Sequence, residues 1–348
     1  MVDHPYASIT QFLLAAAAFV VVVLGMQMAE SILVPFLLAL FLAVITASPF
    51  FWLKRVGVPA PLAMLAVIVV MVGFVLGIVV LVSTSLSGFL QALPRYQALL
   101  ADLTRDAVQF LERFGVDISF QVFSEYFDPG VVMQLAANTF TALSNVLTNV
   151  LLIVVMVIIM LVESMSFPDK LRAALKNPEP TLKFFDRFND TIEQYVLIKT
   201  VLNLVSGALI ALWLTFLGVD FPMLWGLLVF LLNFIPNFGA FIAAVPAILL
   251  SLVELGWGNA LLTLGGYAVV NLTMGNLIEP RFMGRGMGLS VLVVFLSLVF
   301  WGWVLGPVGM VLSVPLTMTV KIGLEAHPQT RWLAILLDGR APAPASPG

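Results

Sequence analysis

Cysteine is absent from the 348-residue sequence, and the only histidines are His4 and His327, near the two ends. The absence of thiols excludes disulfide bonds, thiolate catalysis and cysteine metal sites. Two distant histidines do not form a metal-binding pair, and the sequence contains no Walker A, H-E-x-x-H or G-x-S-x-G motif. We therefore predict no catalytic residues, no metal ligands and no cofactor, and we expect that the protein is not an enzyme.

Charged residues are also scarce. They make up 10% of the sequence and hydrophobic residues 61%, whereas an average soluble domain is roughly 25% charged. Several long stretches contain no Asp, Glu, Lys or Arg: 31–53, 56–94, 129–162, 200–219, 221–253, 255–278 and 286–320. Because a bilayer span needs only about 20 apolar residues, the sequence predicts an all-α, polytopic membrane protein. Its net charge of −3 argues against a nucleic-acid partner.

Hydropathy separates these stretches into two kinds. Six full spans are predicted at 10–29, 31–53, 60–83, 137–162, 197–217 and 259–278. The first is a retained span rather than a signal peptide, because no Lys or Arg precedes it and it is too long for an h-region. The other kind, 221–253 and 286–320, is too long for one straight span and too short for two.

Two amphipathic segments lie between spans, and their charges predict the orientation. The insert at about 85–135 has three arginines beside six acids, whereas 164–196 carries five basic residues. Lys54 and Arg55 form a further basic turn. Because positively charged loops remain in the cytoplasm, we expect both termini and the basic segment inside, and the acidic insert outside. The predicted location is a bacterial inner membrane.

The two long stretches each have helix-breaking residues at the centre. These residues are Asn233, Pro236, Asn237 and Gly239 in the first stretch, and Gly306, Pro307 and Gly309 in the second. Proline removes a backbone donor, and Gly and Asn tolerate turns. The arms on either side of the first break are near 20 Å of helix, which indicates a re-entrant hairpin. Proline and glycine also kink packed membrane helices, and this alternative remains open.

The stretches further resemble each other in what surrounds the break. Each follows a full span, and each break is followed by Val-Pro, at Val245 and Pro246 and again at Val314 and Pro315. If both stretches are hairpins, the first enters the membrane from outside and the second from inside, so the two copies are inverted. The basic residues near 281–285 and Lys321 then all face the cytoplasm, which favours this arrangement. Inverted repeats with interrupted helices are typical of secondary transporters, because exposed backbone is tolerated only where it lines a site or a cavity.

Three motifs carry a family resemblance: NFIPNFG at 233–239, NLIEPRFMG at 276–284 and GPVG at 306–309. With them the chain resembles the autoinducer-2 exporter family of bacterial permeases. The resemblance implies an inner-membrane transporter of about eight transmembrane elements that forms a homo-oligomer. It also implies export of autoinducer-2 for some members and cation/proton antiport for others. Because members differ in what they carry, the resemblance does not fix the substrate. Gly275 departs from the family pattern, which often has Gln there, and this weakens the inference that the chain shares a given member's substrate.

We therefore predict a secondary transporter that moves a small polar solute, such as an autoinducer-2-like signal, by an elevator-like mechanism. A cation/proton antiporter is the first alternative, and a non-transporting membrane scaffold or regulator is the second. The expected partners are the solute or ion, membrane lipid and further copies of the chain. The predicted domains are a scaffold at 1–163, a cytoplasmic basic segment at 164–196, a transport core at 197–322 and a cytoplasmic tail at 323–348, disordered from about 341.

Polar residues within the predicted core are the remaining candidates. Lys199, Asn203, Asn271 and Asn276 are candidate core polar residues, and Glu279 and Arg281 are candidate coupling or gate residues. An acid at the membrane boundary can carry a proton, which favours Glu279. The competing interpretations are a snorkelling lysine, amides that hold helices together and interfacial charges at a helix end. Glu30 and Glu254 are interpreted as interfacial.

Overall fold

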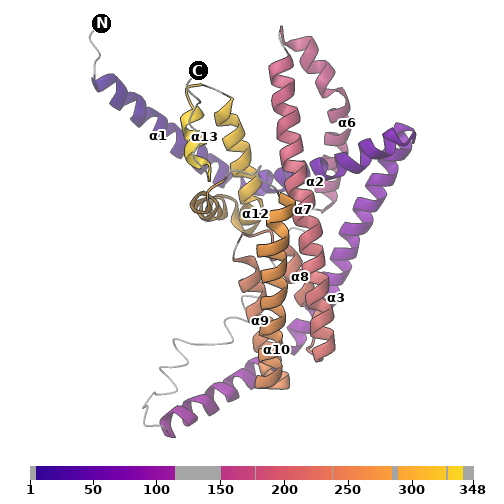
Figure 1. Cartoon of the computed structure of the whole chain (residues 1–348), viewed down its shortest axis with the longest axis vertical. Helices are drawn as coiled ribbons and strands as arrows, with labels where there is room; N and C mark the ends of the chain where they lie inside the picture. The colour runs from indigo at the N-terminus through magenta and orange to yellow at the C-terminus, as the bar shows by residue number, and fades with distance from the viewer. Residues whose placement is uncertain are drawn as a thin grey trace. The chain divides into compact units, whose positions relative to one another are not determined.

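The structure is a computed structural model that describes residues 5–113, 150–176, 178–236, 238–283, 289–326 and 328–339. Within these ranges every regular element is a helix (Figure 1). The helices are α1 (Pro5–Met28), α2 (Glu30–Arg55), α3 (Ala60–Arg113), α6 (Val150–Ala174), α7 (Glu179–Leu217), α8 (Pro222–Leu232), α9 (Gly239–Leu255), α10 (Trp257–Asn271), the π-helix η1 (Leu272–Ile278), α11 (Glu279–Met283), α12 (Val291–Glu325) and α13 (Arg331–Leu337).

Six helical segments among the described residues are long and apolar enough to cross a membrane. They are Glu30–Arg55, Ala60–Asp102, Val150–Ala174, Thr181–Leu217, Trp257–Phe282 and Val291–Glu325. Large apolar side chains on these helices, such as Val70, Ile159 and Phe216, are exposed, as expected of a surface that faces lipid. The predicted all-α polytopic membrane fold is confirmed. The first predicted span falls on α1, and residues 137–149 of the fourth lie outside the described residues.

Helix α3 is much longer than the span predicted within it. It runs for 54 residues without interruption, so the amphipathic helix expected in the 85–135 insert is a continuation of the third span. One face of this continuation is buried, with Leu86, Phe89, Leu93, Tyr96 and Leu100 at alternating spacings of three and four residues. The predicted amphipathic pattern is therefore present as far as Leu100, the helix itself continues to Arg113, and residues 114–149 lie outside the described part of the chain.

The basic segment 164–196 is likewise part of two long helices. It includes the end of α6 and the first half of α7, which runs unbroken into the fifth predicted span. Phe167 of α6 and Phe185 of α7 pack edge to face with ring centroids 5.2 Å apart. The ion pair of Lys170 with Glu163 is exposed on both sides, so it contributes little to stability. The apolar contact is what joins these two helices locally.

The chain forms two compact units. The first comprises residues 1–44, 155–192 and 287–348, and the second comprises 45–154 and 193–286. The broken stretch at 221–253 lies in the second unit and the stretch at 286–320 lies almost wholly in the first. The division into a scaffold and a transport core stays a prediction.

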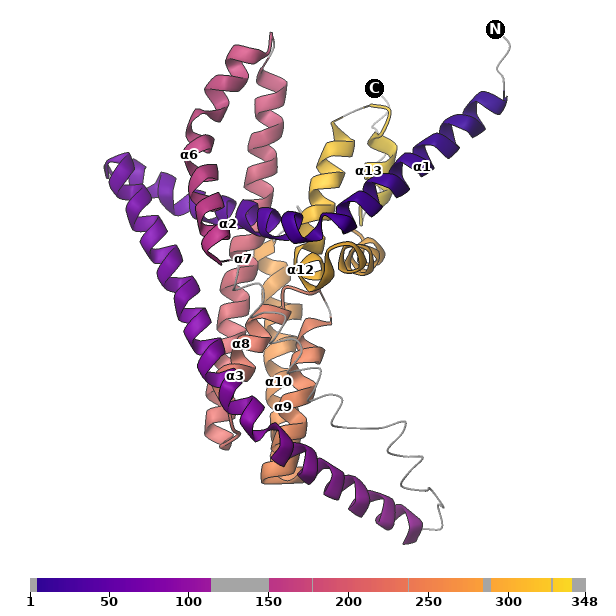
Figure 2. The ribbon, with the colours of Figure 1, turned by 180° about the vertical axis from the view of Figure 1, so that it is seen from behind.

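In the second unit, α7 makes close contacts through glycine with two of its neighbours. A methyl group on Gly207 of α7 would lie 2.5 Å from the carbonyl oxygen of Gly226 on α8, so the two backbones meet without side chains between them. Trp213 of α7 lies against Gly266 of α10, and its indole nitrogen donates to the Leu262 carbonyl at 3.1 Å. Helices α8, α9 and α10 lie beside α7, as both views show (Figures 1 and 2).

Candidate functional site

The first break, between α8 and α9, is a tight turn. The Ile235 amide donates to the Leu232 carbonyl at 2.7 Å, and the Gly239 amide donates to the Ile235 carbonyl at 3.2 Å. Any side chain at Gly239 would overlap the Leu232 carbonyl oxygen, so this position requires glycine. Pro236 lies within the turn, and Asn237 lies outside the described residues. The predicted break is present, and α8 and α9 pack against each other as two short helices.

Asn203 connects this turn to α7. The side chain is 3% exposed. In the amide orientation that satisfies both groups, its oxygen accepts from the Phe234 amide at 3.2 Å and its nitrogen donates to the Lys199 carbonyl at 3.3 Å. The Phe234 amide also donates to the Leu231 carbonyl at 3.3 Å, so the Asn203 side chain adds a second acceptor from a neighbouring helix to a backbone donor of the turn. Asn233 occupies the C-cap of α8, and its own amide donates to Val229.

Lys199 and Glu279 form an ion pair one turn of α7 away from Asn203. The lysine nitrogen lies 2.6 Å from the carboxylate oxygen, and the two side chains are 9% and 24% exposed. Sequence reasoning selected both residues but did not predict that they pair. Arg281, the base of the same motif, is exposed on α11 and takes no part in this ion pair. Glu279, rather than Arg281, is therefore the charged residue of this motif that pairs with α7.

The π-helix η1 directly precedes Glu279. Its wider winding spans Leu272–Ile278 and changes the direction in which the following residues point, compared with an uninterrupted α-helix. Asn271, at the end of α10, is half-buried, and its oxygen would lie 3.5 Å from a methyl group on Gly275. Asn276 is exposed on η1. Short π-helices occur often at functional sites, which directs attention to this end of the α10–α11 segment.

The second break lies inside α12. Leu305 and Gly306 have non-helical backbone angles, and Gly306 adopts φ 64° and ψ −154°, a conformation that favours glycine. Any side chain at Gly309 would overlap the Trp301 carbonyl oxygen, so the chain after the break lies against the chain before it. The indole of Trp301 donates to the Thr317 hydroxyl at 3.0 Å. The helix break predicted at Gly306, Pro307 and Gly309 is therefore present.

The junction of α1 and α2 supplies polar groups to this second break. Pro307 has no N–H, so the carbonyl of Trp303 lacks the donor that a helix would provide. Gln27 donates to that carbonyl at 3.3 Å. A methyl group on Gly306 would lie 2.9 Å from a carboxylate oxygen of Glu30. Sequence analysis did not identify Gln27 and placed Glu30 at the membrane interface. The sequence shows that Pro307 leaves the Trp303 carbonyl without a helical donor, but it does not show which residue supplies one.

A third polar cluster joins α3, the α7–α8 loop and α9. The hydroxyl of Tyr96 donates to Asp220 at 2.9 Å, and the Asp220 amide donates to Glu254 at 3.3 Å. Glu254 lies in the last turn of α9, outside the six spanning helices. Partial burial, together with a side-chain hydrogen bond to Asp220, raises the pKa of Glu254 to about 7. Phe221, next to Asp220, has a left-handed backbone with φ 56°, which is strained for an aromatic residue.

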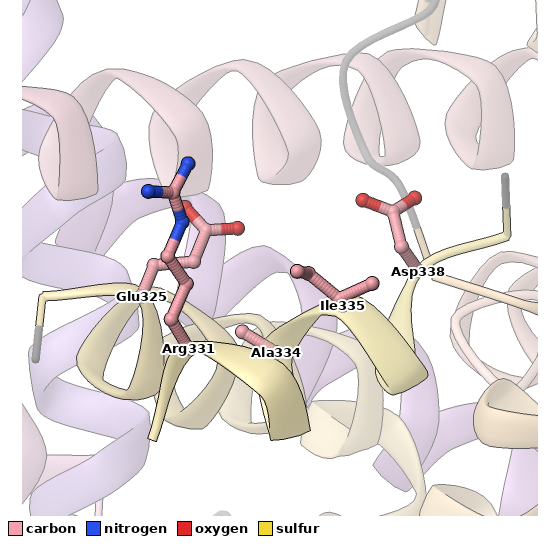
Figure 3. Close-up of a pocket in the computed structure, with 5 residues that line it drawn as sticks. All are labelled: Glu325, Arg331, Ala334, Ile335 and Asp338. Carbon is pink, nitrogen blue, oxygen red and sulfur yellow. The ribbon is translucent and has the colours of Figure 1, made fainter. Parts of the chain in front are cut away.

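The C-terminal helix α13 contributes a hollow that is separate from the breaks. Figure 3 shows its lining, with Glu325 and Arg331 at one end and Asp338 at the other. Asp338 accepts from Lys321 at 3.0 Å, and the Leu337 carbonyl accepts from the Ser290 amide at 3.1 Å. Residues 337–338 therefore join the beginning of α12 to its end. The charges of this hollow already serve a structural contact, so we do not assign it to transport.

Comparison with known proteins agrees with these features. Residues 13–329 match the family described as AI-2E family transporter, and this range includes both breaks and the ion pair. The chain belongs to the AI-2E transporter family. Among its AI-2E relatives, the AI-2 transport protein TqsA of Escherichia coli (strain K12) is 39% identical over 319 residues, which cover 92% of this chain and 93% of TqsA.

Two further relatives are candidate transport proteins. One, from Haemophilus influenzae, is 38% identical over 333 residues, covering 93% of this chain and 95% of the relative. The other is YhhT of Escherichia coli (strain K12), which is 37% identical over 336 residues, covering 97% of this chain and 96% of YhhT. This AI-2E chain is thus a multi-pass membrane protein of a transporter family along nearly its whole length.

Proposed function

We propose that this AI-2E protein is a secondary transporter of the bacterial inner membrane that carries a small polar solute, with autoinducer-2 as the first candidate. The single observation that carries the proposal is the buried ion pair of Lys199 and Glu279, next to a helix break that Asn203 holds from the same face of α7. Interrupted helices with charged neighbours are how membrane transporters expose backbone polar groups to a solute.

The ion pair gives the transporter a way to respond to protons. A proton on Glu279 neutralises the carboxylate and leaves the Lys199 charge, 9% exposed, without its partner. A buried unpaired charge is costly, so protonation favours a conformation in which Lys199 reaches solvent or another acceptor. Because Asn203 lies one turn along α7, such a movement also reaches the first break. Proton binding and solute access then belong to one conformational change.

The choice of autoinducer-2 rests on TqsA, whose name describes an AI-2 transport protein and which is 39% identical over most of both chains. A cation/proton antiporter is the second candidate, since the carboxylate of Glu279 beside α7 could exchange a proton for a cation. We further propose cytoplasmic termini, a homo-oligomer and an elevator-like movement of two inverted, re-entrant hairpins around Pro236, Gly239, Gly306, Pro307 and Gly309.

Flux in proteoliposomes tests the proposal. Purified protein is reconstituted and offered labelled autoinducer-2, other small polar metabolites and monovalent cations, each with and without a pH gradient. We expect saturable autoinducer-2 flux that a pH gradient drives uphill. Cation flux coupled to protons without any solute flux would favour the antiporter. The absence of all flux in a correctly folded, inserted protein would contradict transport and favour a scaffold or regulator.

A further inference from the structure

Tyr267 lies on the buried face of α10, and its side chain carries a buried hydroxyl group. It is 5% exposed. Its hydroxyl has no hydrogen-bond partner among the residues that the structure describes. Buried polar groups in proteins are almost always paired, and a lone hydroxyl costs free energy, especially where no water can reach it. A tyrosine at such a position calls for an explanation, because phenylalanine would fill the same space without that cost.

The surroundings of Tyr267 follow from the register of α9 and α10. Thr263 of α10 donates to Ser251 of α9 at 3.0 Å, and both side chains are fully buried. The two helices pack together in opposite directions. One turn further along α10 is Tyr267, and the matching residue one turn back along α9 is Ala247, which is 0% exposed. The neighbouring residue on α9 is therefore small and apolar, and offers the hydroxyl no partner.

The same face of α10 continues toward the proposed transport site. Residues 263, 267 and 271 are spaced by four, so Thr263, Tyr267 and Asn271 form one polar stripe on the helix. Beyond Asn271 the chain enters η1 and reaches Glu279. On α9 the corresponding direction leads from Ala247 to Gly239, about 12 Å along the helix, at the first break. Tyr267 thus lies on a polar stripe that leads along α10 toward η1 and Glu279.

We propose that Tyr267 contacts the transported solute in a conformation that exposes its hydroxyl, which is buried here, and that the hydroxyl then forms a hydrogen bond with a hydroxyl or carbonyl group of a small polar molecule. The inference rests on the proposed function and adds a residue of the solute site to it. A phenolic hydroxyl is both a donor and an acceptor, so it fits a neutral oxygen-bearing solute better than a bare cation. The cost of leaving the hydroxyl unpaired is then offset when solute is bound.

The test compares two substitutions of the same kind. Tyr267→Phe removes the unpaired hydroxyl, and Tyr96→Phe removes a hydroxyl that donates to Asp220 at 2.9 Å. Each protein is purified, its melting temperature is measured, and its autoinducer-2 flux is followed against solute concentration in proteoliposomes. For Y267F we expect a melting temperature at or above the wild type and a KM about tenfold higher, the size of one hydrogen bond. For Y96F we expect a lower melting temperature and an unchanged KM.

The outcomes separate this inference from the function on which it rests. Equal KM values for wild type and Y267F overturn the inference while the proposed function stands. A melting temperature of Y267F well below that of the wild type also overturns it, because the hydroxyl would then have a partner within the protein. A wild-type protein that moves no solute of the panel overturns the proposed function and this inference together.

Discussion

Lys199 of α7 and Glu279 of α11 lie 2.6 Å apart and are both largely buried, although they come from distant parts of the sequence. The backbone carbonyl of the same lysine accepts a hydrogen bond from the Asn203 side chain. The oxygen of that side chain accepts one from the Phe234 amide at the first break. A single helical turn of α7 thus contacts both a titratable carboxylate and the turn between α8 and α9. This relationship gives the coupling hypothesis a physical route within one unit of the protein.

The first prediction concerns Glu279→Gln. The substitution mimics the protonated acid, so we expect pH-gradient-driven accumulation to be lost while downhill solute exchange continues. Leaving Lys199 buried without its charge partner costs up to about 3–5 kcal/mol of stability. The double variant K199M/E279Q has no charge left to bury and recovers most of that loss. Flux assays with and without a pH gradient, together with melting temperatures, check both parts. Full proton-coupled accumulation by E279Q would show that Glu279 does not couple protons to transport and contributes only to stability.

The second prediction concerns the glycines at the breaks. In Gly239→Ala the new methyl group overlaps the Leu232 carbonyl oxygen, and in Gly309→Ala it overlaps that of Trp301. We expect each to lower stability by about 1–3 kcal/mol and to reduce flux by at least tenfold, because overpacking forces the backbone to shift. Gly265→Ala is the control, since within the described residues no atom beyond the neighbouring turns of its own helix lies within 4 Å of that methyl position. Normal flux in both break variants would mean that the turns are not part of the solute path.

The third prediction concerns the pH dependence of stability at Glu254. Its pKa is raised to about 7 in the folded protein, above that of the unfolded chain. Protonated Glu254 therefore contributes to the stability of the folded protein at low pH, and this contribution is lost as pH rises through neutrality. The groups that face it, Asp220 and Tyr96, supply no positive charge. We expect the wild-type melting temperature to fall from about pH 5 to about pH 8, and Glu254→Gln to flatten this profile. Parallel profiles for the two proteins would contradict the assignment.

The fourth prediction is topological and uses the absence of native cysteine, so that any introduced thiol is the only one present. A cysteine at Gly256 should react with a membrane-impermeant reagent from the periplasm. Cysteines at Ser166 and at Gly286, which is outside the described residues, should react only after the membrane is opened. Periplasmic labelling of the Gly286 variant would contradict the inverted arrangement, because the second hairpin must then begin on the other side.

The sequence predicts most of the helices and both breaks because these features depend on local chemistry. Runs without charge specify the spans, and Pro236 with Gly239, and Gly306 with Pro307, combine proline and glycine within a few residues, which favours a helix break. The insert after the third span was predicted as a separate segment, but α3 continues into it as far as Arg113, with Pro94 inside the helix. Buried Leu93 and Tyr96 on the same face explain this continuity, since packing overrides the local preference.

The residues that meet at the site could not be predicted to the same degree. The pairing of Lys199 with Glu279 depends on where η1 directs the chain, and no sequence pattern specifies a π-helix there. The contact of Gln27 with the Trp303 carbonyl depends on the packing of α1 against α12. The unpaired hydroxyl of Tyr267 becomes visible only once the packing of α9 against α10 is known.

The contact of Gln27 with Trp303 has a practical consequence for work on this protein. The first helix carries an exposed apolar surface and could be taken for a simple anchor that can be shortened or exchanged for a fusion partner. Its last turn, however, satisfies the carbonyl left open by Pro307 in a helix near the other end of the chain. Expression designs that trim or replace α1 would alter the second break without touching its own sequence, so tags are better placed after residue 340.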